Sequence, residues 1–176
     1  MRNGRVRAAP LVVALIALTI GLVDGAVWAE ARSMAGVKVL AVAPFSDDNL
    51  NLRLAATRLG EILSNSGGRF QIIEPARVAE EMKRMGIRVS DLISPARTVA
   101  LGERLGADAV LTGRMVQMSR GGAPAGEARV VIDVRVLEVS SRLKLFEQEI
   151  SYSDVSNAME RAVDGWAREA AAMLTQ

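Results

Sequence analysis

The sequence predicts an α/β domain built on one mixed β-sheet, with elements in the order β-α-β-α-α-β-β-β-α. Three patterns support this fold class. An apolar, β-branched stretch near the start of the domain is typical of a buried strand, later segments carry apolar residues at helical spacing, and the last third contains alternating apolar and polar residues. Early in the chain, helical crossovers favour parallel pairing of neighbouring strands. Later in the chain, short turns require neighbouring strands to be antiparallel.

The first strand is predicted over residues 37–45 and the first helix over residues 52–63. The strand is nearly all apolar and ends at Pro44, because proline donates no ladder hydrogen bond. Residues 46–49 then form a loop with several possible helix N-caps. The helix has an apolar stripe at helical spacing and stops at residues 65–68.

A short second strand is predicted over residues 69–73, followed by two helices with clear ends. The first of these helices begins near Pro75 and closes at Gly86, and the second begins near Pro95 and closes at Gly106. Proline is tolerated in a first helical turn because its missing N–H has no partner there. Glycine readily takes the left-handed conformation that ends many helices.

Three strands over residues 108–118, 129–139 and 145–152 are expected to form an antiparallel meander with one solvated face. In the middle strand, the even-numbered Val and Ile positions point into the core, and Asp133 and Arg135 point to solvent. The helices are expected to cover at least one face of the whole sheet. The prediction is therefore a sandwich with a mixed sheet.

The connection over residues 119–128 is expected to be a Gly/Pro/Ala loop of ten residues, too short to supply membrane-crossing strands. Asp154 is expected to cap a final amphipathic helix. A single apolar stripe on that helix should pack across the sheet, with Trp166 as its largest buried side chain.

Residues 1–29 are expected to be a cleaved Sec-type signal peptide. The first seven residues carry three arginines and no acid, and residues 8–23 contain no charged side chain. This apolar stretch is shorter than the roughly 20 residues of a membrane-spanning helix. A Val-Trp-Ala sequence places small side chains at the positions that signal peptidase requires, with the cut before Glu30. An uncleaved inner-membrane anchor is the alternative.

Residues 30–36 are then a short lead, and residues 37–176 are a single periplasmic domain. Removing the signal removes three arginines and one aspartate, so the 22 basic and 20 acidic residues become 19 of each and the net charge falls from +2 to zero. The basic residues are scattered among acids, so no nucleic-acid partner is expected. The absence of cysteine in the sequence excludes lipid attachment at a cysteine, so the protein is not expected to be a lipoprotein.

The chain contains no histidine and no cysteine, which excludes thiolate metal sites and most familiar hydrolase triads. No catalytic, cofactor-binding or metal-binding residues are assigned, no cofactor is expected, and the protein is not expected to be an enzyme. Glu61, Glu80 and Glu81 could in principle act as an acid and a base. Adjacent glutamates on a helix point about 100° apart, however, so a solvated outer face is the expected role of these side chains.

Three segments together resemble a known group of bacterial envelope domains: residues 39–45 (VLAVAPF), 68–74 (GRFQIIE) and 105–113 (LGADAVLTG). The group includes the curli-secretion lipoprotein CsgG, the penicillin-binding-protein activator LpoB and the N-terminal domain of TolB. The similarity spans roughly residues 37–174. The resemblance implies an anticodon-binding-domain-like α/β sandwich in the periplasm that acts by binding other proteins and has no catalytic residues. In the third segment, Asp108 is expected to have a structural role.

Two groups of residues are candidates for partner binding. Asp47, Asp48 and Asn49 follow the first strand, where open α/β sheets often bind ligands, and their oxygens could hold a cation such as Ca²⁺. Helix capping is the simpler explanation of this group.

The second group is the solvent edge of the meander with Arg129, Arg135 and Arg142, next to the expected loop over residues 119–128. Arginine is enriched in protein interfaces, although an ordinary solvated sheet face explains these positions as simply.

The sequence favours a non-catalytic periplasmic accessory or adaptor protein that binds components of a cell-envelope assembly or secretion machine. The expected partners are envelope proteins of unknown identity, with no stable membrane insertion after signal cleavage and with the oligomeric state left open. The alternative is a periplasmic small-ligand-binding protein or a carboxylate-based envelope enzyme. Such an enzyme needs two carboxylates about 5 to 9.5 Å apart in one cleft.

Overall fold

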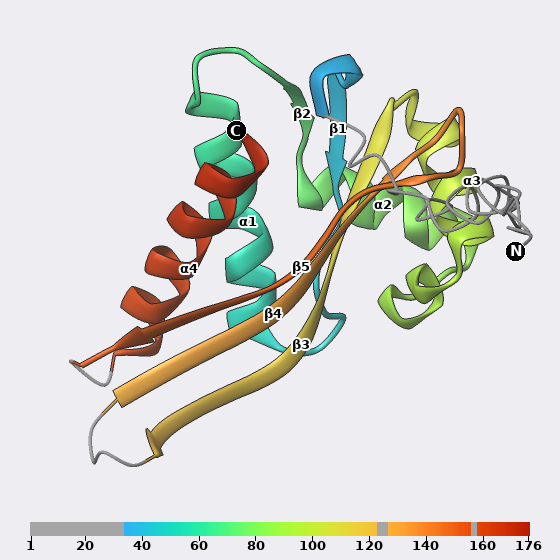
Figure 1. Cartoon of the computed structure of the whole chain (residues 1–176). Helices are drawn as coiled ribbons and strands as arrows, with labels where there is room; N and C mark the ends of the chain where they lie inside the picture. The colour runs from blue at the N-terminus through green and yellow to red at the C-terminus, as the bar shows by residue number, and fades with distance from the viewer. Residues whose placement is uncertain (1–33, 123–126, 156–157) are drawn as a thin grey trace, which may run out of the picture. The chain divides into compact units, whose positions relative to one another are not determined.

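The computed structural model describes residues 34–122, 127–155 and 158–176 (Figure 1). The chain divides into two units, Met1–Glu30 and Ala31–Gln176, and the description concerns the second. The predicted signal peptide lies outside the described residues, as does most of the predicted lead. In chain order the elements are η1 (Met34–Gly36), β1 (Val39–Val42), α1 (Leu50–Asn65), β2 (Gln71–Ile73), α2 (Pro75–Met85), η2 (Val89–Ile93), α3 (Pro95–Leu105), β3 (Ala109–Gly122), β4 (Glu127–Glu138), β5 (Lys144–Asp154) and α4 (Met159–Leu174).

The five strands form one mixed sheet in the order β2-β1-β3-β4-β5. β1 pairs in parallel with both β2 and β3. β3, β4 and β5 form the predicted antiparallel meander. The predicted element order, the mixed α/β sandwich and the distribution of parallel and antiparallel neighbours are therefore confirmed.

One face of the sheet is covered by α1 and α4, which lie side by side (Figure 1). The inward positions of β4 predicted from the alternation are fully buried there. Trp166 of α4 is also fully buried, and its indole N–H donates to the carbonyl oxygen of Ile150 at 3.1 Å. The ring of Trp166 meets Phe45 edge to face, with the centroids 5.8 Å apart. These contacts join α4, β5 and the segment after β1 in one core.

The opposite face of the sheet has a smaller core under α2, η2 and α3. Ala41 of β1 and Val110 of β3 pack there against Val78, Leu92 and Leu101 of the three helical segments. Further along the meander this face is open to solvent, as at Gln117, Arg129, Glu149 and Ser151. The helices thus cover one face over most of its length and the other face over one end.

Proline and glycine set the ends of α2 and α3 as predicted. Pro75 and Pro95 occupy the first helical positions. Gly86 and Gly106 follow the last turns with φ of 66° and 68°, in the left-handed region. None of the helices in the described part of the chain is long and apolar enough to cross a membrane.

The expected loop over residues 119–128 is wrong, because most of that segment is strand. β3 continues to Gly122 and β4 begins at Glu127, with Ser119 paired to Arg129 and Arg120 paired to Ala128. Ladder hydrogen bonds to the neighbouring strand outweighed the weak strand propensity of the Gly-rich sequence. The length of this connection therefore gives no reason against membrane-crossing strands.

The expected cap at Asp154 is also wrong. Asp154 is the last residue of β5, and Ala158 is the N-cap residue of α4. Val155, which would lie in the first turn of the expected helix, precedes α4 and is 82% exposed. The alternating pattern of β5 continues through Tyr152 to Asp154, so pairing with β4 extends the strand past the expected helix start.

Glu81 is not on a solvated outer face, since it is only 7% exposed. Its two carboxylate oxygens accept hydrogen bonds from Arg104 of α3 at 3.0 Å and from Arg84 at 3.1 Å. These two hydrogen bonds hold the pKa of Glu81 below its usual value, and the bond from Arg104 contributes most. Glu81 therefore links α2 to α3 as a structural ion pair.

A close approach of α3 to β3 and β4 predicts the effect of a glycine substitution. A Cβ atom on Gly102 would lie 2.3 Å from Val139 and 2.9 Å from Val110. We expect Gly102→Ala to lower the free energy of unfolding by about 1 to 3 kcal/mol through overpacking, as measured by urea denaturation.

The matched control is Gly60→Ala in α1, where the nearest atom, in Pro75, would be 3.4 Å from the new Cβ. Because alanine has the higher helix propensity, this variant should be as stable as the wild type or more stable by up to about 1 kcal/mol. Equal stability losses in the two variants would contradict the packing described for α3.

Candidate functional site

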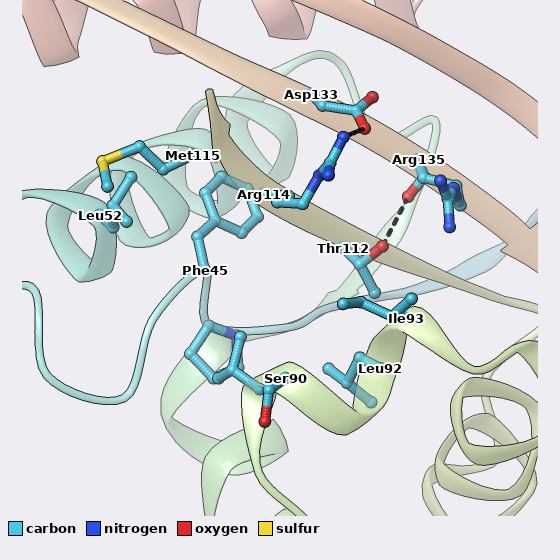
Figure 2. A pocket seen from close by; sticks show the side chains of 13 residues that line it. Phe45, Leu52, Ser90, Leu92, Ile93, Thr112, Arg114, Met115, Asp133 and Arg135 are labelled. Carbon is cyan, nitrogen blue, oxygen red and sulfur yellow. Dashed lines mark hydrogen bonds and ion pairs between the residues drawn. The ribbon is translucent and has the colours of Figure 1, made fainter. Parts of the chain in front are cut away.

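One cavity of the described domain lies where β1 ends and β3 continues. β1 is four residues long and β3 is fourteen. The last β1–β3 ladder pair joins Val42 to Leu111, after which the chain leaves the sheet. This departure opens a pocket of about 360 Å³ (Figure 2). The lining residues are Pro44, Phe45, Leu52, Val89, Ser90, Leu92, Ile93, Thr112, Gly113, Arg114, Met115, Asp133 and Arg135. We call this cavity the β3 pocket.

The location follows from the topology of the sheet. β1 is connected through α1 to β2 on one side, and the chain returns through α2 and α3 to β3 on the other side. In open α/β sheets, ligands bind beyond the carboxyl ends of strands at such a switch point. The β3 pocket occupies this position between the start of α1 and η2.

The Phe45 side chain forms one wall of the pocket and depends on a glycine in β3. A Cβ atom on Gly113 would lie 2.6 Å from the Phe45 ring. Any side chain there would displace the ring, which also packs against Trp166. Leu52 of α1 and Leu92 of η2 complete the buried apolar lining.

Two ion pairs line the solvent side of the pocket. The Arg114 guanidinium is directed toward Asp133 and donates to it at 3.2 Å (Figure 2). Arg135 donates to Glu147 of β5 from two nitrogens, at 2.6 and 2.9 Å. Glu147 also pairs with Lys144, and hydrogen bonds from Lys144 and Arg135 lower the pKa of Glu147. The Glu147 carboxylate is therefore held in its charged form.

Exposed aliphatic side chains gather at this end of the domain. Ile93 and Met115 line the pocket and are 65% and 44% exposed. Val116, the next residue of β3, is 47% exposed, and Leu50 begins α1 two residues before Leu52. Two of the six large exposed hydrophobic residues in the described part of the chain thus line the pocket, and two more lie within two residues of a lining residue in the sequence. Such clustering marks an interaction site more often than isolated exposed residues do.

The loop with Asp47, Asp48 and Asn49 has mainly a local structural role. The Asn49 side chain caps α1 by accepting from Leu52 N–H at 3.2 Å. Asp47 accepts from Val89 N–H at 3.3 Å and so ties this loop to η2 beside the β3 pocket. Asp48 is exposed. No group of three acidic side chains within the described residues could hold a metal ion.

The three predicted arginines do not form one surface. Arg135 lines the β3 pocket, and Arg129 lies further along β4, opposite Ser153. Arg142 lies in the turn between β4 and β5 with φ of 61° and lines a second cavity beside Glu138. The structure therefore brings only Arg135 to the pocket. Its direct role in partner binding, and those of the other five candidates, remain predictions.

Asp108, a residue of the segment 105–113, has the structural role that the sequence suggested. Its carboxylate accepts from Lys38 N–H at 2.9 Å and from Val39 N–H at 2.8 Å. These hydrogen bonds lower the pKa of Asp108, and the bond from Val39 N–H contributes most. The contact fixes the start of β1 against the start of β3, at the end of the sheet away from the β3 pocket.

The β3 pocket was not predicted from the sequence. No pattern in the sequence assigned Ile93, Arg114 or Met115 to a site. Each lies in a segment whose pattern is typical of an ordinary strand or of the residues that precede a helix. The available signal was the mismatch between a short apolar strand ending at Pro44 and a strand that continues well past Gly113.

No family model matches this chain, and no curated protein does. Solved structures match its fold. Lipoprotein GNA1162 from Neisseria meningitidis has a TM-score of 0.59 and 20% identity over 78% of this chain and 97% of that protein. CT253 from Chlamydia trachomatis, a hypothetical protein, has a TM-score of 0.56 and 14% identity, over 78% and 95%. The PelC dodecamer from Paraburkholderia phytofirmans has a TM-score of 0.53 and 14% identity, over 78% and 86%.

Escherichia coli LpoB is matched more weakly, with a TM-score of 0.47 and 15% identity over 65% of this chain and 55% of LpoB. At these identities the likenesses establish the fold alone. The predicted resemblance to CsgG and TolB stays a prediction.

The Asp108 contact predicts a pH dependence of stability. Because the folded-state pKa is depressed, the contact stabilises the protein above the unfolded pKa of about 4, and this stabilisation is lost as the pH falls through the folded pKa. We expect Asp108→Asn to reduce stability at pH 7 by about 1 kcal/mol, a value discounted for the exposure of the side chain. Thermal unfolding at pH 7 and pH 3 measures the effect.

The difference between wild type and Asp108→Asn should shrink at pH 3, because the wild-type carboxyl is then largely protonated in the unfolded chain. Asp48→Asn, in an exposed position, serves as the control. A constant difference at both pH values would contradict the assigned role.

Proposed function

We propose that this chain is a non-catalytic accessory or adaptor protein of the bacterial cell envelope, and that it binds other envelope proteins at the β3 pocket. The observation that carries the proposal is the make-up of this pocket. Apolar side chains from three elements, Leu52, Ile93 and Met115, lie beside two arginines. Apolar area next to arginine is typical of the central part of protein interfaces.

The chemistry of the pocket favours binding over catalysis. The chain has no histidine or cysteine, so a general base would have to be a carboxylate or a lysine. Asp133 is the one carboxylate residue among the lining residues, and it already accepts a hydrogen bond from Arg114. A carboxylate-based glycosidase site needs a second carboxylate in the same cleft.

The envelope setting rests on two supports. The N-terminal sequence is expected to be an export signal. The fold is also similar to that of a protein named as a lipoprotein and to that of PelC, which is a dodecamer in its solved structure. The export signal and this analogy support our proposal that the chain is a periplasmic component of an envelope assembly.

A periplasmic small-ligand-binding protein is the second candidate function. The volume of the β3 pocket, about 360 Å³, falls within the range of roughly 300 to 1,000 Å³ that small-molecule sites occupy. A small ligand would bury Ile93 and Met115 without any protein partner. The two candidate functions therefore differ in what contacts Ile93 in the cell: a protein partner in the first, and a small molecule in the second.

Site-specific photo-crosslinking in cells separates these candidates. With p-benzoylphenylalanine at position 93, we expect a discrete crosslinked product that contains one envelope protein. The same probe at position 83 in α2, where Lys83 is exposed and outside the pocket, is the control and should give no such product. Intact-mass analysis of the purified protein also tests the predicted cleavage before Glu30.

A protein crosslinked equally from positions 93 and 83 would indicate nonspecific contact. The absence of any protein product at position 93, together with a small molecule that co-purifies with the protein, would contradict the adaptor function and favour the ligand-binding alternative.

A further inference from the structure

The edge of β3 that borders the pocket has backbone groups without a strand partner. The carbonyl oxygen of Leu111 accepts from Ala43 N–H at 2.9 Å, which is the last hydrogen bond between β3 and the segment that continues β1. In a strand, the N–H and C=O of one residue point to the same side, and successive residues alternate sides. The backbone groups of Gly113 and Met115 therefore face this same edge, and no described strand pairs with them there.

The unpaired edge opens directly into the β3 pocket. Gly113, Arg114 and Met115 all line it. A strand added at this edge would extend the line of β1 and would place alternate side chains on the two faces of the sheet. On the α1 face it would meet Leu52 and Met115.

On the other face the added strand would meet Arg114. Ile132 and Val134 of β4 belong to the core under α1 and α4, so Asp133 and its partner Arg114 lie on the opposite face. Arg114 is 68% exposed, and one of its nitrogens bonds to Asp133. A guanidinium has five N–H donors, so Arg114 retains donors for a second carboxylate.

We infer that this edge captures an extended segment of a partner protein as an additional β-strand, with a large apolar side chain in the β3 pocket and a neighbouring Asp or Glu on Arg114. This inference rests on the proposed function and specifies the chemistry of the partner. Main-chain hydrogen bonds supply affinity in this mode of recognition, and pockets for alternate side chains supply specificity. The recognised segment thus alternates apolar and acidic residues.

A second copy of this chain fits the edge less well than an isolated segment does. The outer strands of the sheet are β2, which is only three residues long, and β5, on which α4 is packed through the hydrogen bond from Trp166 to Ile150. On the face of the sheet that α1 and α4 cover, Phe45 and Leu52 already fill the space beside Gly113. The β5 strand of another copy would bring its helix into this space, whereas a bare extended segment would not.

Selection from a phage library of random ten-residue peptides on the purified domain tests the inference. We expect the selected peptides to alternate large apolar residues with Asp or Glu. Methylating the backbone nitrogens of alternate residues in one selected peptide should weaken binding at least tenfold in one of the two registers, because a strand pairs through every second residue. Binding through side chains alone would tolerate both registers, and this result would overturn the inference.

Two protein variants provide the reciprocal test. Met115→Pro removes the N–H that faces the free edge and leaves the neighbouring pairs with β4 in place, and we expect it to abolish peptide binding. Arg114→Gln should weaken binding of the acidic peptide about tenfold, whereas Arg77→Gln, an exposed arginine of α2 outside the pocket, should leave it unchanged. The Arg114→Gln and Arg77→Gln pair keeps the test valid if Met115→Pro fails to fold.

The crosslinking experiment distinguishes failure of the inference from failure of the proposed function. An envelope protein crosslinked at position 93 that persists in Met115→Pro and Arg114→Gln would retain the adaptor function and overturn strand addition. A library selection that yields no specific peptide would also overturn strand addition. If no envelope protein is crosslinked at position 93, the proposed function itself fails.

Discussion

The early end of β1 determines the form of the candidate site. Pro44 has no N–H to donate, so the chain cannot continue as a strand between β2 and β3 and turns away after Val42. β3 has no such break and continues to Gly122 because β4 pairs with it along most of its length. The difference in strand length leaves a sheet edge that is buried at Leu111 and open at Met115.

The residue after this proline joins the site to the core. Phe45 is 3% exposed, covers Gly113, and meets the fully buried Trp166 edge to face. Paired aromatic rings of this geometry contribute about 0.5 to 1.5 kcal/mol beyond the area that they bury. The pocket wall is therefore held by the same packing that fixes α4 on the sheet. The rim, with Ile93 and Met115, has no comparable support and remains exposed.

The sequence predicted the elements whose signals are local. Pro95 and Gly106 bracket α3, and the alternation in β4 identified its buried face, because these features depend on backbone conformation and side-chain period. It did not predict the extension of β3 through Gly122 or the burial of Glu81, since both depend on residues far away in the chain. The pocket was missed for the same reason: it arises from the relative lengths of β1 and β3.

Amide hydrogen exchange of the free protein, measured residue by residue by NMR, tests most directly whether the β3 edge is open. We expect slow exchange at Leu111, whose backbone groups face β1, and exchange at least tenfold faster at Gly113 and Met115, whose N–H groups face the unpaired edge. Equal protection at the three positions would show that the edge is already paired or covered, and would contradict the assignment of this edge as the binding site.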